Sequence, residues 1–162
     1  MAEIVLTPKG EVDIMVEAET ITPDAFANKK AAEIEQLKVW QGPRELPLSE
    51  FFDVEGDAGN ADDTTIIIEE DVPRVKLIGA GMTCGSIVVE GSVGMHVGSE
   101  MVGGSILVKG DAGSWAGMEM KGGTLHILGD AADHVGCAYR GSWHGMSGGR
   151  IVIEGSAKSQ LG

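Results

Sequence analysis

Four histidines and two cysteines are the side chains of this 162-residue chain that are best suited to metal binding. A zinc centre needs three or four such ligands converging on one point. His126 lies in an alternating apolar segment and points outward from it, whereas His96 and His134 lie in turns, one position apart in their repeats. We expect these histidines to share no face, and the sequence predicts no zinc site.

Cys84 and Cys137 are too few to hold a Cys₄ iron–sulfur cluster or a closed zinc site. The acidic, alternating N-terminus lacks the basic and apolar regions of a secretory signal, so we also expect no disulfide. Cys84 stands where other repeats carry Gly, which predicts a tight turn. Both cysteines are interpreted as small apolar residues.

An insertion, "YRGSWHG" at residues 139–145, contains Tyr139, Arg140, Trp143 and His144. Tyr, Trp and Arg are enriched at interface hot spots. Trp115, in the turn of the preceding repeat, is predicted to stand beside Trp143. Three interpretations remain open: local packing of a widened coil, docking to a partner protein, and contact of Arg140 and His144 with an anionic substrate tail.

A repeat of 19 residues positions these side chains. Copies begin at Met82, Met101, Met120 and Met146, and an imperfect copy occupies residues 64–81. The insertion lengthens one copy by seven residues. Self-similarity at a fixed period marks a repeat architecture.

Each copy contains a short alternating run bounded by glycine, which predicts a β-strand rather than a helix. Two aliphatic columns are expected to face inward, one through Ile87 and one through Val89, while the column through Glu90 faces outward. A second short strand is expected in the stretches that end at Val97, Ala116, Val135 and Leu161. The methionines that open the copies are predicted to form a ladder in the core.

Short strands with glycine corners and no helix between copies favour coils stacked on coils, with equivalent strands paired in parallel. Strict six-residue periodicity, typical of the left-handed hexapeptide helix, is missing from the sequence. A calcium-binding β-roll would need Asp at a fixed place, yet Ser92 and Ser156 alternate there with Asp111 and Asp130. Turn-capping explains this Asp/Ser position better than calcium.

Residues 1–60 are predicted to form a small α/β cap and linker, and residues 61–162 the solenoid with an incomplete last coil. Thr22, Pro23 and Asp24 form a helix-start signal, and a second short helix is expected from about Asn28 through Ile34 and Leu37. Trp40, Phe51 and Phe52 are the expected apolar anchors of the cap. "GDAGNADD", residues 56–63, is interpreted as the linker.

The formal net charge of −13 is uneven. Residues 1–70 carry 17 acidic and 5 basic side chains, whereas residues 71–162 carry 8 and 7. A nucleic-acid surface would need clustered Lys and Arg, so we exclude nucleic acid as a partner. No run of about 18 apolar residues is present, so a membrane span is not expected.

The repeat "GGSILVKGDAGSWAGMEMKGG" resembles the GXGXG repeat domain. That domain ends the large subunit of glutamate synthase and also forms the C-type subunit of formylmethanofuran dehydrogenase. Three stretches favour the second family: "VWQGPRELPLSEFFDVEG", "GSVGMHVGSEMVGG" and "SWAGMEMKGGTLHILGDAADHVGCAYRGSWHGMSGG". The resemblance implies a mainly β fold, a right-handed parallel β-solenoid of the GXGXG type with coils of about 19 residues.

The resemblance further implies a non-catalytic scaffold subunit in a cytoplasmic complex of methanogens that reduces CO₂ and condenses the formate onto methanofuran. The tungsten or molybdenum pterin, the binuclear metal site and the iron–sulfur clusters are then expected in partner subunits of pterin-binding, metallo-hydrolase-like and ferredoxin-like types. No catalytic, cofactor or metal residue carries over to this chain. Members of the family run for several more repeats, so we expect another polypeptide to complete the solenoid, or the chain to be a fragment.

Two rival functions stay open. One is the β-helix domain of a glutamate synthase as a separate chain, working with flavin-containing partners. The segment "VWQGPRELPLSEFF" argues against it. The other is a free-standing structural or interaction module that needs no metal-bearing partner.

Overall fold

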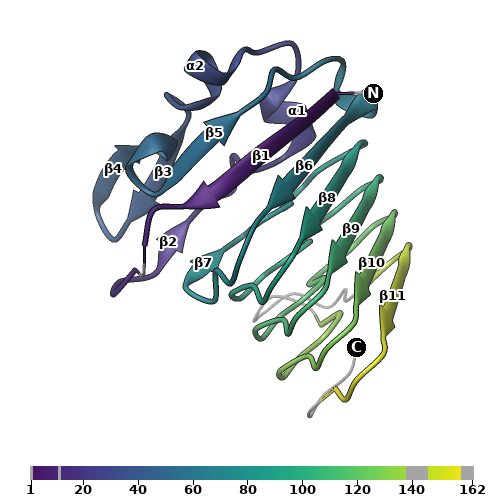
Figure 1. Cartoon of the computed structure of the whole chain (residues 1–162). Helices are drawn as coiled ribbons and strands as arrows, with labels where there is room; N and C mark the ends of the chain where they lie inside the picture. Colours follow the sequence, from purple (N-terminus) through teal and green to yellow (C-terminus); the bar gives the residue numbers. More distant parts are fainter. Residues whose placement is uncertain (1, 11, 138–145, 158–162) are drawn as a thin grey trace.

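The computed structural model describes residues 2–10, 12–137 and 146–157 and is mainly β (Figure 1). Strands β6, β8, β9, β10 and β11 come from successive repeats and lie side by side. The described strands are β1 (Ala2–Pro8), β2 (Val16–Glu17), β3 (Lys38–Gln41), β4 (Arg44–Pro47), β5 (Phe52–Glu55), β6 (Thr64–Ile68), β7 (Val75–Lys76), β8 (Ser86–Val89), β9 (Ser105–Val108), β10 (Thr124–Ile127) and β11 (Arg150–Ile153). The short helices are α1 (Pro23–Phe26), α2 (Ala31–Ile34), η1 (Leu48–Glu50) and η2 (Ala61–Asp63).

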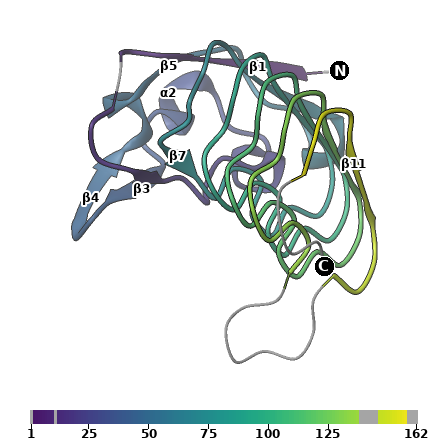
Figure 2. The same ribbon diagram turned by 90° about the horizontal axis from the view of Figure 1, so that it is seen from below.

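Each repeat forms one coil, and equivalent residues of neighbouring coils pair in parallel. Ile66, Ile87, Ile106, Leu125 and Ile151 follow one another across the sheet. The step from β10 to β11 keeps this register although the insertion lies between them. Figure 2, which looks along the stack, shows the coils lying over one another. The predicted 19-residue register is therefore confirmed between β8, β9 and β10, whereas β6 and β8 pair at a spacing of 21 residues.

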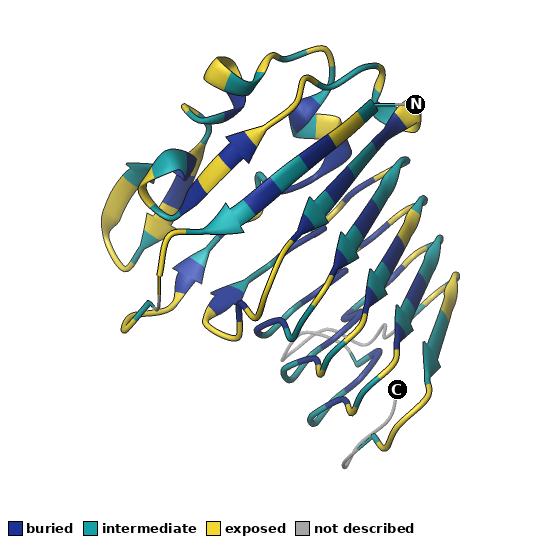
Figure 3. Ribbon diagram, viewed as in Figure 1, coloured by how far each residue is buried: buried dark blue, intermediate teal, exposed yellow. Residues whose placement is uncertain are grey.

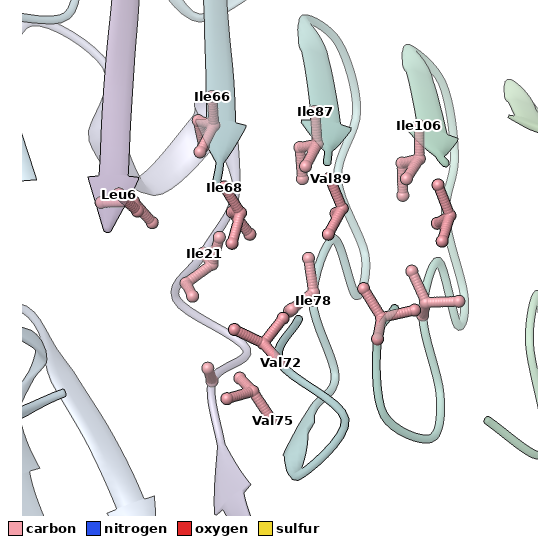
Figure 4. Close-up of a cluster of buried hydrophobic side chains, with 14 of the residues drawn as sticks. Leu6, Ile21, Ile66, Ile68, Val72, Val75, Ile78, Ile87, Val89 and Ile106 are labelled. Carbon is pink, nitrogen blue, oxygen red and sulfur yellow. The ribbon is translucent and has the colours of Figure 1, made fainter. Parts of the chain in front are cut away.

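The inward columns form the core, as the alternation predicted. Ile87 and Val89 are buried (Figure 4), as are their counterparts in β9 and β10. Glu90 and its counterparts are exposed. Figure 3 shows how buried and exposed residues alternate along the coils. Of the four methionines predicted to form a ladder, Met82, Met101 and Met120 are fully buried, and Met146 is partly buried against the same core. Burying each such side chain contributes roughly 1.5–3 kcal/mol.

The expected second strand is wrong in its placement. Single parallel bridges join Val72, Val93, Ala112, Ala131 and Ala157 in turn. The last four of these residues each lie four positions before a residue where a strand was expected to end. Val97, Ala116 and Val135 lie in turns and are buried. The chain turns here because a left-handed residue stands just before each of them (His96, Trp115 and His134), which ends an extended run. Leu161 lies outside the described residues.

A column of glycines opens each strand. Gly85, Gly104, Gly123 and Gly149 all have φ near +80°. A Cβ on Gly104 would lie 2.6 Å from the carbonyl oxygen of Gly85 in the preceding coil. Ser105 donates its backbone N–H to that same oxygen over 3.0 Å. Glycine is therefore required both by the backbone conformation and by the close approach of the coils.

A second column caps the turns that follow the strands. Asp111 Oδ1 accepts the backbone N–H of Asp130 over 2.8 Å, and Ser92 Oγ accepts that of Asp111 over 2.9 Å. Asp71 and Asp130 accept in the same way from Ser92 and Ser156. The prediction of turn-capping by alternating Asp and Ser is confirmed, because one acceptor per coil satisfies one donor of the next.

The N-terminal segment contributes to both sheets. Strand β1 pairs in parallel with β6 and antiparallel with β5, so the larger sheet has the order β11-β10-β9-β8-β6-β1-β5. The smaller sheet, β4-β3-β2-β7, ends on the first coil. One cluster of buried side chains extends from Ile4 to Val135. The division of the chain near residue 60 stays a prediction.

The first helix begins as predicted, because Thr22 Oγ1 accepts the backbone N–H of Ala25 over 3.1 Å and Pro23 fills the first turn. Asp24 in that turn also accepts from the backbone and the hydroxyl of Thr83, which ties the helix to the second coil. The second helix is shorter than expected. It spans Ala31–Ile34, because Asn28 adopts a left-handed conformation.

The expected anchors of the N-terminal segment are only partly confirmed. Phe52 is buried and Phe51 is half-buried against the core. Trp40 is 36% exposed, so its assignment as an anchor is wrong. The alternation of β3 explains the difference, because Val39 occupies the inward position and Trp40 the outward one.

We expect Gly104→Ala to lower the free energy of unfolding more than Gly81→Ala. Both positions have positive φ, which costs an L-residue about 1–2 kcal/mol. Only Gly104 faces the preceding coil, whereas nothing lies within 4 Å of a Cβ at Gly81. Urea denaturation of both variants measures the difference, and equal losses would contradict the close-approach explanation.

We expect Asp111→Ala to cost about 0.5–1.5 kcal/mol, because the backbone N–H of Asp130 loses its acceptor. Asp111→Ser is the matched control, since Ser92 makes the equivalent bond one coil earlier. The serine variant should keep most of the stability in a thermal-unfolding comparison. Indistinguishable midpoints for the two variants would show that the cap contributes nothing.

Candidate functional site: a column of stacked rings

Three rings from successive coils stack in one column, and the column is defined by His96, Trp115 and His134. The centroids of Trp115 and His134 are 4.2 Å apart with 14° between the ring planes. His96 lies on the other side of Trp115, at 6.2 Å and 9°. The smaller spacing is close to the rise between parallel strands, so the coil repeat itself sets the stack. All three residues are half-buried.

The backbone holds these residues in the same conformation in each coil. His96, Trp115 and His134 have φ of 63°, 66° and 63°. His96 donates its N–H to the Ser114 carbonyl, and Trp115 donates to the Asp133 carbonyl. Non-glycine residues at positive φ are uncommon, and clustered examples are worth examining for function.

The Ser99 hydroxyl lies within hydrogen-bonding distance of the His96 imidazole. Ser99 is 1% exposed, and its Oγ lies 3.3 Å from both His96 Nδ1 and the backbone carbonyl oxygen of Trp115. The hydroxyl therefore links the turn of one coil to the turn of the next. This contact restricts the orientation of the His96 imidazole.

Charge and burial at one end of the column favour neutral His96. Burial lowers the pKa of His96, and the nearby Lys76 ammonium lowers it further, while Glu17 opposes the shift. Lys76 and Glu17 form an ion pair with 3.5 Å between Nζ and Oε1. A neutral imidazole is suited to stacking and hydrogen bonding rather than to binding an anion by charge.

The structure corrects the expectation that the histidines share no face. His96 and His134 occupy the same position of their repeats and lie on opposite sides of Trp115. Their 19-residue spacing from Trp115 was the signal that could have found the column. His126 does face outward, as predicted, and its Nε2 lies 2.9 Å from Glu154 Oε2.

Among the residues predicted to contact a partner or substrate tail, the structure places only Trp115. Tyr139, Arg140, Trp143 and His144 lie outside the described residues, as does the expected proximity of Trp143 to Trp115. Trp115 has one ring face against His134, so its contribution to any interface must come from its edge and from the column as a whole.

A half-buried apolar column crosses the outer face of the larger sheet. It contains Val88, Leu107 and Val152, together with His126. The parallel pairing extends this column to Ile67 and Val5. It is a further surface suited to contact with another protein.

The described residues contain no group of three or more His, Cys, Asp or Glu side chains that could hold a metal ion. Burial raises the pKa of the Cys137 thiol, which favours the less nucleophilic protonated form. Cys84 is a free thiol, and Cys137 Sγ lies 3.8 Å from the carbonyl oxygen of Val135. The stacked, half-buried rings of the column are themselves suited to aromatic stacking and contact.

Proteins from methanogens are similar in sequence to between 60% and 91% of this chain. The C-type subunit of molybdenum-containing formylmethanofuran dehydrogenase 1 from Methanosarcina barkeri is 63% identical over 98 residues, covering 60% of this chain and 33% of that protein. The C-type subunit of tungsten-containing formylmethanofuran dehydrogenase 2 from Methanococcus maripaludis is 55% identical over 147 residues, covering 91% and 53%. The chain is thus similar to the C-type subunits of formylmethanofuran dehydrogenases. No family model matches it.

A solved structure shows the same arrangement. A chain of the formyltransferase/hydrolase complex FhcABCD from Methylorubrum extorquens, solved with methylofuran, superimposes with a TM-score of 0.86 at 35% identity. The match covers 94% of this chain and 56% of that one. The chain thus spans between a third and little more than half of the length of these relatives.

No helix among the described residues has the length and apolar character needed to cross a bilayer.

We expect the stability of the chain to fall as the pH drops below the ordinary histidine pKa of about 6.5. The folded-state pKa of His96 lies below the unfolded value, so the unfolded state binds the proton more readily and protonation favours unfolding. Histidine NMR titration should give a pKa below 6.5 for His96. Lys76→Gln should raise that pKa, because it removes the neighbouring positive charge.

His96→Gln should weaken the dependence of the urea midpoint on pH between 7 and 5. A His96 pKa at or above 6.5 in the unmodified chain would contradict the assigned effect of burial and Lys76.

Proposed function

We propose that this chain is the C-type subunit, or a portion of it, in a tungsten- or molybdenum-containing formylmethanofuran dehydrogenase, acting there as a scaffold without a catalytic centre of its own. The observation that carries the proposal is the 55% identity with such a subunit over 91% of this chain. The agreement includes the N-terminal segment, which lies outside the repeats. The similarity therefore does not rest on the repetitive glycine pattern alone.

The scaffold role is supported by the kind of fold that the sequence produces. Stacked coils bury aliphatic and methionine side chains, and the columns of Gly, Asp and Ser serve to hold coil against coil. We interpret the architecture as a right-handed parallel β-solenoid of the GXGXG type. Such a rigid stack presents long, regular surfaces on which other subunits can dock.

The chemistry is assigned to partner subunits in this proposal. CO₂ reduction at a tungsten or molybdenum pterin, condensation of formate onto methanofuran at a binuclear metal site, and electron supply through iron–sulfur clusters take place in other chains of a cytoplasmic complex in methanogenesis. This chain positions the pterin-binding, metallo-hydrolase-like and ferredoxin-like subunits.

The ring column and the insertion are proposed as one docking site on the scaffold. Trp115 lies at the centre of the column, and residues 139–145 follow the coil that carries His134. Tyr139, Arg140, Trp143 and His144 supply the residue types that dominate interface energetics.

A second candidate is the corresponding subunit of a formyltransferase/hydrolase complex, favoured by the structural match to FhcABCD. That complex was solved with methylofuran, whereas the curated relatives are named as dehydrogenase subunits. The higher identities to the dehydrogenase subunits, 63% and 55% against 35%, favour the first proposal.

The test is to purify the chain at its natural level from its own cells and to identify co-eluting proteins and metals by mass spectrometry. We expect several large partners together with tungsten or molybdenum, iron and zinc. The same purification with Arg140→Ala and Trp143→Ala combined should recover less of the partners while the chain itself stays folded.

Partners without tungsten or molybdenum would favour the formyltransferase/hydrolase candidate. Elution of the chain alone and free of metal would overturn both candidates. Full recovery of partners with the double variant would remove the insertion from the docking site.

A further inference from the structure

Ser99 determines which ring nitrogen of His96 carries the proton. Its buried Oγ donates to the backbone carbonyl oxygen of Trp115 over 3.3 Å and also lies 3.3 Å from His96 Nδ1. A serine hydroxyl has one hydrogen, so once that hydrogen points to the carbonyl, the oxygen can only accept from the imidazole. With the proton on Nε2 instead, one of the two contacts would set two acceptors against each other. The two contacts together therefore assign the proton of neutral His96 to Nδ1.

The other ring nitrogen of His96, Nε2, is then an acceptor. Burial lowers the pKa of His96 and the Lys76 ammonium lowers it further, so at neutral pH the ring is uncharged and Nε2 keeps its lone pair. Nε2 has no hydrogen-bond partner among the described residues, where His96 bonds through Nδ1. No buried side-chain nitrogen or oxygen in that part of the chain lacks a partner, so Nε2 is open to solvent.

Trp115, stacked beside His96, offers the opposite function. The indole Nε1–H is a donor only. It makes no hydrogen bond with the residues that the structure describes, and the same reasoning leaves it open to solvent. The two ring centroids are 6.2 Å apart and the ring planes differ by 9°. Neighbouring coils thus present one free acceptor and one free donor side by side.

We propose that His96 Nε2 and Trp115 Nε1 bind the main chain of an extended segment of a partner protein, which donates an N–H to the imidazole and accepts from the indole at a carbonyl. Main-chain groups on one side of an extended segment recur every two residues, at intervals of about 6.6 Å. That interval is close to the 6.2 Å between the two rings. This binding mode rests on the ring column being a docking site, as proposed for the chain, and specifies the group that the site takes.

The combination of one acceptor and one donor argues against charged occupants. A carboxylate only accepts, so it has no hydrogen for the lone pair of His96. An ammonium or guanidinium group only donates, so it cannot bond the indole of Trp115. Nucleic acid bases offer both functions, but their phosphates meet a chain with a formal net charge of −13. A main-chain peptide group offers both functions and carries no charge.

The first arm of the test measures the tautomer in the full chain by itself. Histidine labelled with nitrogen-15 is observed by NMR at a pH well above the ordinary histidine pKa. We expect His96 to show a protonated Nδ1 and an unprotonated Nε2, and Ser99→Ala to shift the population toward protonated Nε2. A protonated Nε2 in the unmodified chain, or a tautomer that Ser99→Ala leaves unchanged, would overturn the proposal.

The second arm measures how much of the chain is retained in the complex purified from cells. Trp115→Phe keeps a ring for stacking and removes the N–H, and His96→Phe keeps a ring and removes the acceptor. Each should lower retention about two- to tenfold, as expected for the loss of one net hydrogen bond. Val102→Ala, at an exposed apolar position outside the column, should leave retention unchanged. Thermal unfolding of each isolated variant checks that the fold is kept, and full retention of folded Trp115→Phe would overturn the proposal.

The third arm identifies the occupant by cryo-EM of the same complex. We expect a main-chain N–H of a different protein at His96 Nε2 and a main-chain carbonyl at Trp115 Nε1. A charged side chain, a nucleotide, a second copy of the chain or solvent alone at these atoms would overturn the proposal. Metal analysis separates this result from the proposed function. A complex with these contacts but without tungsten or molybdenum would contradict the dehydrogenase assignment and support the main-chain site.

Discussion

The pairing of each coil with the next, residue against equivalent residue, is the constraint on which the rest of this structure depends. Parallel strands normally need a helical crossover to return the chain to its starting side. Here the remainder of each coil provides that return, so strands β8, β9 and β10 hydrogen-bond at a 19-residue spacing. Because equivalent residues pair, the aliphatic residues, the methionines, the glycines and the Asp/Ser caps of neighbouring coils each align in a column. The register also continues from β10 to β11 beyond the insertion.

The same register produces the chemistry of the surface. A residue type at one position of the repeat recurs one coil away, so apolar or aromatic positions become extended columns rather than isolated spots. His96, Trp115 and His134 form such a column because each occupies the left-handed position of its turn. The half-buried residues on the outer face of the larger sheet form another. Regular columns of this kind suit the docking of other subunits, which is consistent with the proposed scaffold function.

The N-terminal segment adds to the stack through both sheets. Strand β1 continues the parallel ladder, and β7 of the first coil closes the smaller sheet against β2. This arrangement places most of the acidic side chains, 17 of 25, in the segment of residues 1–70 that adds to the stack.

The sequence by itself determined the features that repeat: the period, the inward and outward columns, the methionine ladder, the turn caps and the start of the first helix. These follow from local alternation and turn chemistry, which a single chain displays directly. Tertiary structure decided the features that depend on which segments meet. Strand β1 joins the larger sheet between β6 and β5, and Trp40 faces outward because the pairing of β3 with β2 buries Val39 instead. The ring column required both, since the 19-residue spacing was present in the sequence but only the stacked turns brought His96 and His134 against Trp115.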